Sequence, residues 1–137
     1  MRETFRGVVY PWQCDIFDHM NVQFYMEKFD QAAWGFFGQM GIGADYFFKE
    51  DKGIVAMEHK IRYYKELVAG DLVYIKSELT KVGNKSMCFR HLLYNAMTNE
   101  VAAEFEAVAV QIDTNTRKST PFTAVVRAYL EAEMENK

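Results

Sequence analysis

The chain has 137 residues, of which 50% are hydrophobic and 26% are charged, which indicates one globular domain and excludes a disordered chain. Its net charge of −3 argues against nucleic acid as a partner, and two cysteines are too few for a disulfide framework. No stretch is apolar enough to span a membrane and none resembles a signal peptide, so we expect a cytoplasmic protein without membrane or nucleic-acid partners.

The first part of the chain predicts one short strand and one long helix. Residues 4–10 have the pattern of a strand that ends before Pro11. Apolar residues then recur at spacings of three and four over residues 21–40, which predicts a helix with a broad apolar face. Asn21 suits the N-cap, because its side-chain oxygen can accept a backbone N–H of the first turn. A helix this apolar should be enclosed by the rest of the fold.

The middle and the second half predict four strands, at residues 54–64, 72–81, 86–94 and 101–112. We expect consecutive strands to be neighbours in an antiparallel meander, with the long Ala/Val-rich last strand in a central position. The first of these strands alternates in polarity. Its expected apolar face comprises Val55, Met57, His59, Ile61 and Tyr63.

A second helix is expected near the C-terminal end, with Thr120 as its cap and Pro121 at its first position. This order of elements predicts a single α+β domain over residues 1–137, in which the long helix packs on a curved antiparallel sheet. Aromatic residues make up 15% of the chain, and this surplus suggests that some aromatic surface is buried between subunits.

The segment just ahead of the long helix concentrates reactive side chains: Asp15, Asp18, His19 and Asn21. The start of a helix offers free backbone N–H groups and a partial positive charge, which can stabilise an oxyanion. A carboxylate beside it can act as a nucleophile or a general base on an activated acyl group. The alternative is structural, with Asp18 or Asn21 capping the helix and Asp15 solvated.

This segment resembles the active-site signature of the 4-hydroxybenzoyl-CoA thioesterase branch of the hot-dog superfamily. Asp15, His19, Met20, Asn21 and Tyr25 fall on that pattern in register. Residues 63–71, ending in Gly-Asp, and residues 81–86, with a glycine, a basic residue and a serine, are similar to two further landmarks of the family. The resemblance implies a hot-dog fold, with a long antiparallel sheet wrapped around a central helix, and a homodimer or a dimer of dimers.

The resemblance also implies an acyl-CoA thioesterase for a small or medium acyl group, with no cofactor and with coenzyme A as part of the substrate. Asp15 would be the catalytic carboxylate, as nucleophile or general base, and the backbone N–H of Val22 would be the oxyanion donor. Substrate contacts would come from Phe17, Asp18, His19, Asn21 and Tyr25.

The chain departs from the family pattern at three positions. Asp18 replaces the usual glycine, Gln13 replaces a common acid, and Glu66 replaces a common proline. None of these removes Asp15, the carboxylate that the family uses.

Two short basic segments are candidates for binding the phosphates of coenzyme A. They are Lys85 with Ser86 and Arg117 with Lys118. Cationic side chains suit a pyrophosphate and a ribose phosphate. The alternative is that both segments are solvated turns.

Other functions are less well supported by the sequence. The histidines have no metal-ligand spacing, so we expect no metal site. His59 is expected to be a hydrogen-bonded core histidine, and His91 has no assigned role. A non-catalytic acyl-CoA-binding module and an enoyl-CoA hydratase remain alternatives, although hydratases of this fold typically place a His five residues after the Asp and His19 is four after Asp15.

Overall fold

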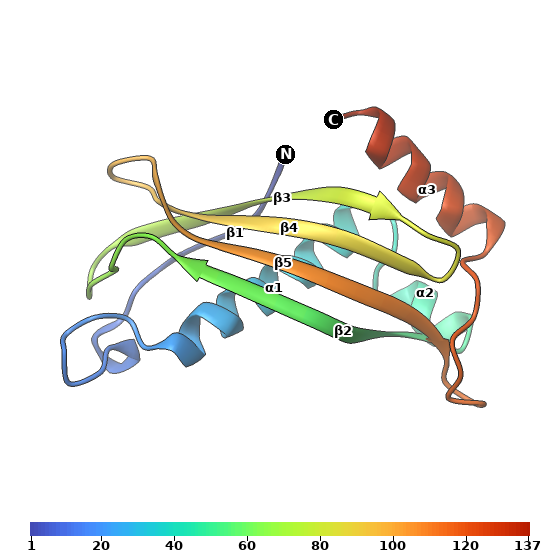
Figure 1. The fold of residues 1–137 in the computed structure, drawn as a ribbon, viewed down its shortest axis with the longest axis horizontal. Coiled ribbons are helices and arrows are strands. Elements are labelled where there is room, and N and C mark those ends of the chain that lie inside the picture. Colours follow the sequence, from blue (N-terminus) through green and yellow to red (C-terminus); the bar gives the residue numbers. More distant parts are fainter.

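The computed structural model describes residues 1–137 and contains one five-stranded sheet and three α-helices. The sheet order is β1-β3-β4-β5-β2, with every neighbouring pair antiparallel. Helix α1 lies across one face of this curved sheet (Figure 1), which confirms the predicted α+β hot-dog arrangement. In chain order the elements are β1 (Arg2–Val8), a 3₁₀ turn (Pro11–Gln13), α1 (Val22–Gln39), α2 (Ala44–Lys49), β2 (Lys52–Tyr63), β3 (Leu72–Val82), β4 (Ser86–Asn95), β5 (Glu100–Asp113) and α3 (Ala124–Glu135).

The core lies between α1 and the inner face of the sheet. The helix buries Tyr25, Phe29, Ala32 and Phe36, which follow one another at spacings of three and four. Phe29 stacks on Phe105 of β5, with ring centroids 5.0 Å apart. The predicted enclosure of this helix is therefore confirmed.

No helix of the chain has the length and apolar character needed to cross a membrane. The two chain ends lie near one another beside β3 (Figure 1), where Arg2 and Glu133 form an ion pair at 2.8 Å.

The predicted meander is wrong for one strand. Strands β3, β4 and β5 are consecutive neighbours, but β2 pairs with β5 at the edge of the sheet and does not touch β3. The chain crosses from β2 to β3 through residues 64–71, and the fully buried Leu67 anchors this connection by accepting the N–H of Met20 at 2.7 Å. Alternation in a sequence identifies a strand but not its neighbour, which long-range packing decides.

The predicted face of β2 is also wrong in its first half. A β-bulge lies between Ala56 and Glu58, so one residue, Met57, is inserted relative to β5. Ala56 consequently shares the inner face with His59, whereas Val55 points to the outer face. A single inserted residue changes the phase of the alternation, and the sequence pattern does not reveal it.

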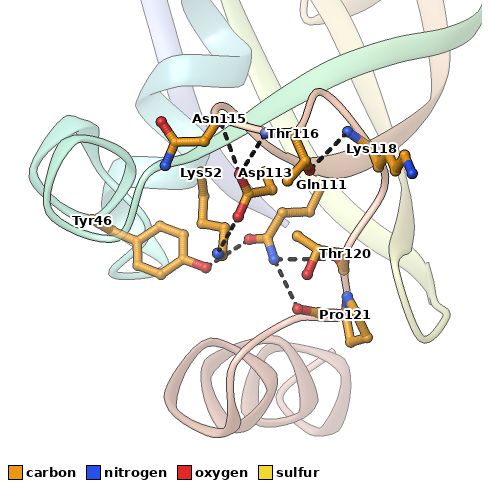
Figure 2. A network of polar contacts seen from close by, with 9 residues as sticks. All are labelled: Tyr46, Lys52, Gln111, Asp113, Asn115, Thr116, Lys118, Thr120 and Pro121. Atoms are coloured by element: carbon orange, nitrogen blue, oxygen red, sulfur yellow. Dashed lines mark hydrogen bonds and ion pairs between the residues drawn. The ribbon is translucent and has the colours of Figure 1, made fainter.

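The last helix starts later than predicted. Thr123 caps α3, and its Oγ1 accepts the N–H of Val126 at 3.3 Å. Thr120 and Pro121 precede the helix, and their carbonyls accept hydrogen bonds from the buried Gln111 side chain at 3.5 and 3.0 Å (Figure 2). Tertiary contact with β5 therefore holds these two residues outside the helix.

Helix α2, which the sequence analysis did not anticipate, is fixed by the same side chain. The hydroxyl of Tyr46 donates a hydrogen bond to Oε1 of Gln111 at 2.6 Å (Figure 2). Gln111 thus joins α2, β5 and the segment before α3.

Candidate active site

The loop before α1 is folded back on itself by main-chain bonds. Cys14 and Met20 form an isolated antiparallel bridge. Within it, the N–H of Asp15 donates to the carbonyl of His19 at 3.0 Å, and the N–H of Asp18 donates to the carbonyl of Asp15 at 3.0 Å. The loop therefore holds Asp15 and His19 side by side at the start of the helix.

Asp15 itself is partly buried rather than fully solvated. Its Oδ1 accepts the N–H of Phe17 at 2.9 Å, and its second carboxylate oxygen has no partner within the chain. This hydrogen bond is an Asx turn, which fixes one oxygen and leaves the other available.

The helix cap is Asn21, as predicted. Its Oδ1 accepts the N–H of Gln23 at 3.2 Å. Asp18 does not cap the helix, which removes that structural alternative. Instead Asp18 has φ +63°, the left-handed conformation that a glycine adopts freely. This is the position at which the family pattern described above has a glycine.

Val22 is the first residue of α1, an 18-residue helix. Its N–H has no carbonyl four residues earlier within the helix and lies at the positive end of the helix dipole. The residue is exposed, and its N–H donates no hydrogen bond within the chain. The arrangement can stabilise negative charge on an oxygen placed against it.

A groove lies beside this helix start, between α1 and the end of β2. His19, Val22 and Tyr25 line one side, and Tyr63 and Glu66 line the other. Nε2 of His19 lies 2.9 Å from Oε2 of Glu66 and ties the loop to the β2–β3 connection. Asp15 does not line the groove, although its backbone N–H is bonded to the carbonyl of His19, which does.

Tyr25 stands edge-on to Tyr63, with ring centroids 4.9 Å apart. Burial, assisted by Tyr63 and Glu66, raises the pKa of Tyr25 to about 12. The phenol therefore stays protonated at neutral pH and remains a hydrogen-bond donor. Phe17, by contrast, is 72% exposed and is not among the groove residues.

The predicted phosphate-binding residues belong to the β3–β4 and β5–α3 connections, which lie at the opposite end of the sheet from the loop before α1 (Figure 1). The carbonyl of Lys85, just before Ser86 and β4, accepts the N–H of Gln111, and the carbonyl of Lys118 accepts the N–H of Asp113, both at 2.8 Å. Arg117 occupies the turn after β5 with φ +63°. The structure thus brings these residues together around the end of β5 but not near Asp15 of the same chain.

Asp113 organises that turn (Figure 2). Its Oδ1 accepts the N–H groups of Asn115 and Thr116 at 2.8 and 3.0 Å, and these bonds lower the pKa of Asp113. Lys52 lies 3.5 Å from its other oxygen. Lys118 extends from the same turn.

A second hollow, hereafter the aromatic cavity, lies further along α1, between this helix and strands β2, β4 and β5. Its volume is about 110 Å³. His59 and Asp30 are its polar lining residues, and five aromatic residues line it as well: Phe29, Trp34, Phe37, Phe89 and Phe105. The sequence analysis did not find this cavity, because β2 joins it only through the edge pairing with β5.

The core histidine of the sheet is His91, to which the sequence analysis assigned no role, and not His59 as predicted. His59 faces inward but is exposed, because β2 is an edge strand. His91 on β4 is fully buried, and its Nδ1 shares a hydrogen bond with Oγ of Ser77. The alternation of His91 with Met87, Phe89 and Leu93 was the available signal.

Comparison with known proteins supports the family and the fold. A model of the thioesterase-like superfamily matches residues 9–130. The chain is 24% identical over 114 residues to the L-carnitine dehydrogenase/betainyl-CoA thioesterase of a Rhizobium species, covering 83% of this chain. The chain spans only 23% of that relative's length.

Solved structures share the whole fold. A hypothetical protein of Staphylococcus aureus in complex with CoA superposes with a TM-score of 0.92 at 18% identity, covering 99% of this chain and 86% of that chain. The probable thioesterase YbaW of Escherichia coli gives 0.83 at 22% identity, covering 96% and 98%. A 1,4-dihydroxy-2-naphthoyl-CoA thioesterase of Synechocystis gives 0.80 at 13% identity, covering 92% and 93%. These likenesses confirm the predicted fold.

Proposed function

Because the chain belongs to the thioesterase-like superfamily, we propose that it hydrolyses an acyl-CoA thioester with a small or medium acyl group, using Asp15 as the catalytic carboxylate. The observations that support the proposal are the main-chain bonds that hold Asp15 beside His19 in the loop just before α1, and the free amide of Val22 at the first position of that helix. Three of the four proteins compared above also involve CoA: the betainyl-CoA thioesterase, the Staphylococcus aureus protein in complex with CoA, and the 1,4-dihydroxy-2-naphthoyl-CoA thioesterase.

The Val22 amide supplies the oxyanion contact in this proposal. When a nucleophile adds to the thioester carbon, the carbonyl oxygen gains negative charge, and a helix N-terminal N–H stabilises it. Tyr25, kept protonated by its raised pKa, is a second donor that faces the same groove.

Asp15 acts on the carbonyl carbon by one of two routes. Its free carboxylate oxygen can attack the carbon and expel the CoA thiolate, after which water hydrolyses the resulting anhydride. Alternatively, it accepts a proton from a water molecule that attacks the carbon directly. In both routes the sulfur leaves as a thiolate, so no strong general acid is needed.

The position of the basic residues favours a second copy of the chain as part of the site. Strand β2 is an edge strand of the sheet, unpaired on one side, and is about 36 Å long. The loop before α1 lies near its end, and the β3–β4 and β5–α3 connections lie near its start (Figure 1). Antiparallel pairing of β2 with β2 of a second copy would bring opposite ends together. Lys85, Ser86, Arg117 and Lys118 of one copy would then bind the CoA phosphates beside Asp15 of the other.

An acyl-CoA panel, monitored for release of free thiol, tests the proposal. The Rhizobium relative is named for betainyl-CoA, whose acyl group carries a quaternary ammonium, so cationic acyl groups belong in this panel. We expect wild-type protein to release thiol, and we expect Asp15→Asn to lower turnover by about 100-fold or more with an unchanged fold. Asp45→Asn, on exposed α2, is the matched control and should retain full activity.

The outcomes separate the alternatives. A folded Asp15→Asn protein with near-normal turnover would remove Asp15 from the mechanism. Tight binding of acyl-CoA without thiol release would indicate a binding module. Hydration of enoyl-CoA without CoA release would indicate a hydratase.

A further inference from the structure

We propose that Arg127 of α3 positions the turn between β3 and β4 so that the free backbone N–H groups of Asn84 and Lys85 bind a phosphate of coenzyme A. The inference rests on the proposed function and deepens it, because Lys85 and Ser86 are already candidates for phosphate contacts there. It adds two main-chain donors to that site and a positioning residue that sets their direction.

The carbonyls of this turn are held from outside the turn. The guanidinium of Arg127 donates through Nη2 to the carbonyls of Gly83 and Asn84, at 2.8 and 3.1 Å. The N–H of Phe122, just before α3, donates to the same Asn84 carbonyl at 3.2 Å. Hydrogen bonds from a charged donor are the stronger ones, so Arg127 is the main contact that fixes the turn against α3.

These bonds also set the direction of two N–H groups. In a trans peptide group the C=O and the N–H point in opposite directions, and the chain has no cis peptide bond. The carbonyl of Gly83 shares its peptide group with the N–H of Asn84, and the carbonyl of Asn84 shares its own with the N–H of Lys85. Because Arg127 binds both carbonyls, both N–H groups point away from its guanidinium.

Both of these N–H groups are available to a ligand. Neither donates a hydrogen bond within the chain, and Asn84 and Lys85 are both exposed. Successive main-chain N–H groups in a turn can form a concavity that binds anions. The ammonium of Lys85 and the hydroxyl of Ser86 add a positive charge and a further donor, and a phosphate group offers several acceptor oxygens to such a set.

Arg127 has stronger contacts with the turn than with its own helix. Glu131, one turn later on α3, lies 3.8 Å from its Nη1, and the ring of Phe122 lies 5.9 Å from its guanidinium carbon. Exposed ion pairs of this kind contribute little. Since Nη2 is committed to the two carbonyls, we assign Arg127 a positioning role rather than a direct contact with the phosphate.

Two substrates with the same acyl group test the inference. One is the best acyl-CoA of the panel, and the other is the corresponding acyl-pantetheine, which has the same thioester but no phosphate. Arg127→Gln should raise KM for acyl-CoA by about tenfold and change kcat by less than about twofold. KM for acyl-pantetheine should stay within about twofold of the wild-type value. A merely structural defect would affect both substrates alike.

Two further variants sharpen this comparison. Glu131→Gln removes the ion pair within α3 but leaves the bonds from Arg127 to the turn, so it should leave both KM values unchanged. Arg127→Lys keeps a positive charge and donor groups on a flexible side chain. It should therefore raise KM for acyl-CoA by less than Arg127→Gln does.

An NMR titration with CoA observes the N–H groups themselves. In wild-type protein, CoA should shift the backbone amide signals of Asn84 and Lys85, whereas pantetheine should leave both unchanged. This measurement needs no variant, so it decides the question even if Arg127→Gln fails to fold. If the two amides do not respond at any CoA concentration, the inference is wrong.

The outcomes distinguish this inference from the proposed function. If wild-type protein hydrolyses acyl-CoA but Arg127→Gln changes KM equally for both substrates, or for neither, the inference alone is overturned. Failure of wild-type protein to hydrolyse any acyl-CoA overturns the proposed function. The CoA titration then still tests the phosphate contact at Asn84 and Lys85.

Discussion

Ser77 on β3 and His91 on β4 form a hydrogen bond that is wholly shielded from solvent, between Oγ and Nδ1. Oγ of Ser77 lies 2.7 Å from Oγ1 of Thr4 on β1, so three strands share one polar chain inside the core. The other nitrogen of His91, Nε2, has no partner. The ring is stacked with Phe29 and Phe105.

The buried His91 should make the stability depend on pH. Burial lowers the pKa of His91 to about 3, against about 6.5 in the unfolded chain. Between these two values the unfolded chain binds a proton that the folded chain does not, so stability is fully present above pH 6.5 and falls on acidification. Urea unfolding should show a loss of about 2 kcal/mol between pH 7 and pH 5 from this group.

The matched variants for this experiment are His91→Phe and His59→Phe. His91→Phe should remove that part of the pH dependence, whereas His59→Phe should leave most of it, because burial is the larger cause of the low pKa of His91 and His59 the smaller. If the pH dependence of His91→Phe equals that of wild type, another group is responsible.

The cap of α1 should matter for both stability and catalysis. Asn21→Ala removes the hydrogen bond to the Gln23 N–H and should lower the free energy of unfolding by about 1 kcal/mol. Because the Val22 amide follows directly, kcat should fall as well. Thr123→Ala removes the equivalent bond at α3, so a similar loss of stability with unchanged kcat is the expected control. If kcat were the same in both variants, the Asn21 cap would not influence the Val22 amide in catalysis.

The left-handed backbone at Asp18 predicts an order among substitutions. Glycine adopts φ +63° without steric cost, whereas a β-carbon without a polar side chain costs about 1 kcal/mol or more there. Asp18→Gly should therefore be more stable than Asp18→Ala by about 1 kcal/mol in thermal or urea unfolding. The reverse order would mean that the loop does not keep this conformation in solution.

Gln13 and Lys28 form a buried polar contact that one substitution could convert into an ion pair. Lys28 is 3% exposed, its Nζ lies 3.5 Å from Oε1 of Gln13, and burial lowers its pKa. Gln13→Glu would place a carboxylate against this ammonium, and we expect a gain in stability of about 1 kcal/mol at pH 7. The gain should be lost as the new carboxyl protonates on acidification.

A double-mutant cycle checks this pairing. In a Lys28→Met background the same Gln13→Glu change should destabilise the protein, because the new carboxylate would be buried without a counter-charge. Equal effects in both backgrounds would contradict a direct interaction.

Local features of the fold could be predicted well from the sequence. The apolar spacing and Asn21 predicted α1 and its cap, and the two strands expected at residues 72–81 and 86–94 predicted the antiparallel pairing of β3 with β4. These features depend on residues close to each other in the chain, so propensity and periodicity carry them.

Features that depend on distant contacts could not be predicted. The edge position of β2 follows from its pairing with β5, about 50 residues later, and the bulge at Met57 leaves no sign in the alternation. Thr120 had the composition of a helix cap, but Gln111 holds it outside the helix. The position of the Asp15 segment at the start of α1 could be predicted because its residues are close together in the sequence. The aromatic cavity could not, because residues of four separate elements line it.

The side chain of Gln111 links two helices that are far apart in the sequence, so that the stability of each depends on the other. A single amide fastens Tyr46 of α2 and the carbonyl of Pro121 ahead of α3 to the same point on β5. Neither helix can then open without disturbing the other. In Gln111→Leu, which lacks these hydrogen bonds, the rates of backbone amide hydrogen exchange over residues 44–49 and 120–126 should therefore increase together. The two helices would behave as one cooperative unit, although about 70 residues and four strands separate them along the chain.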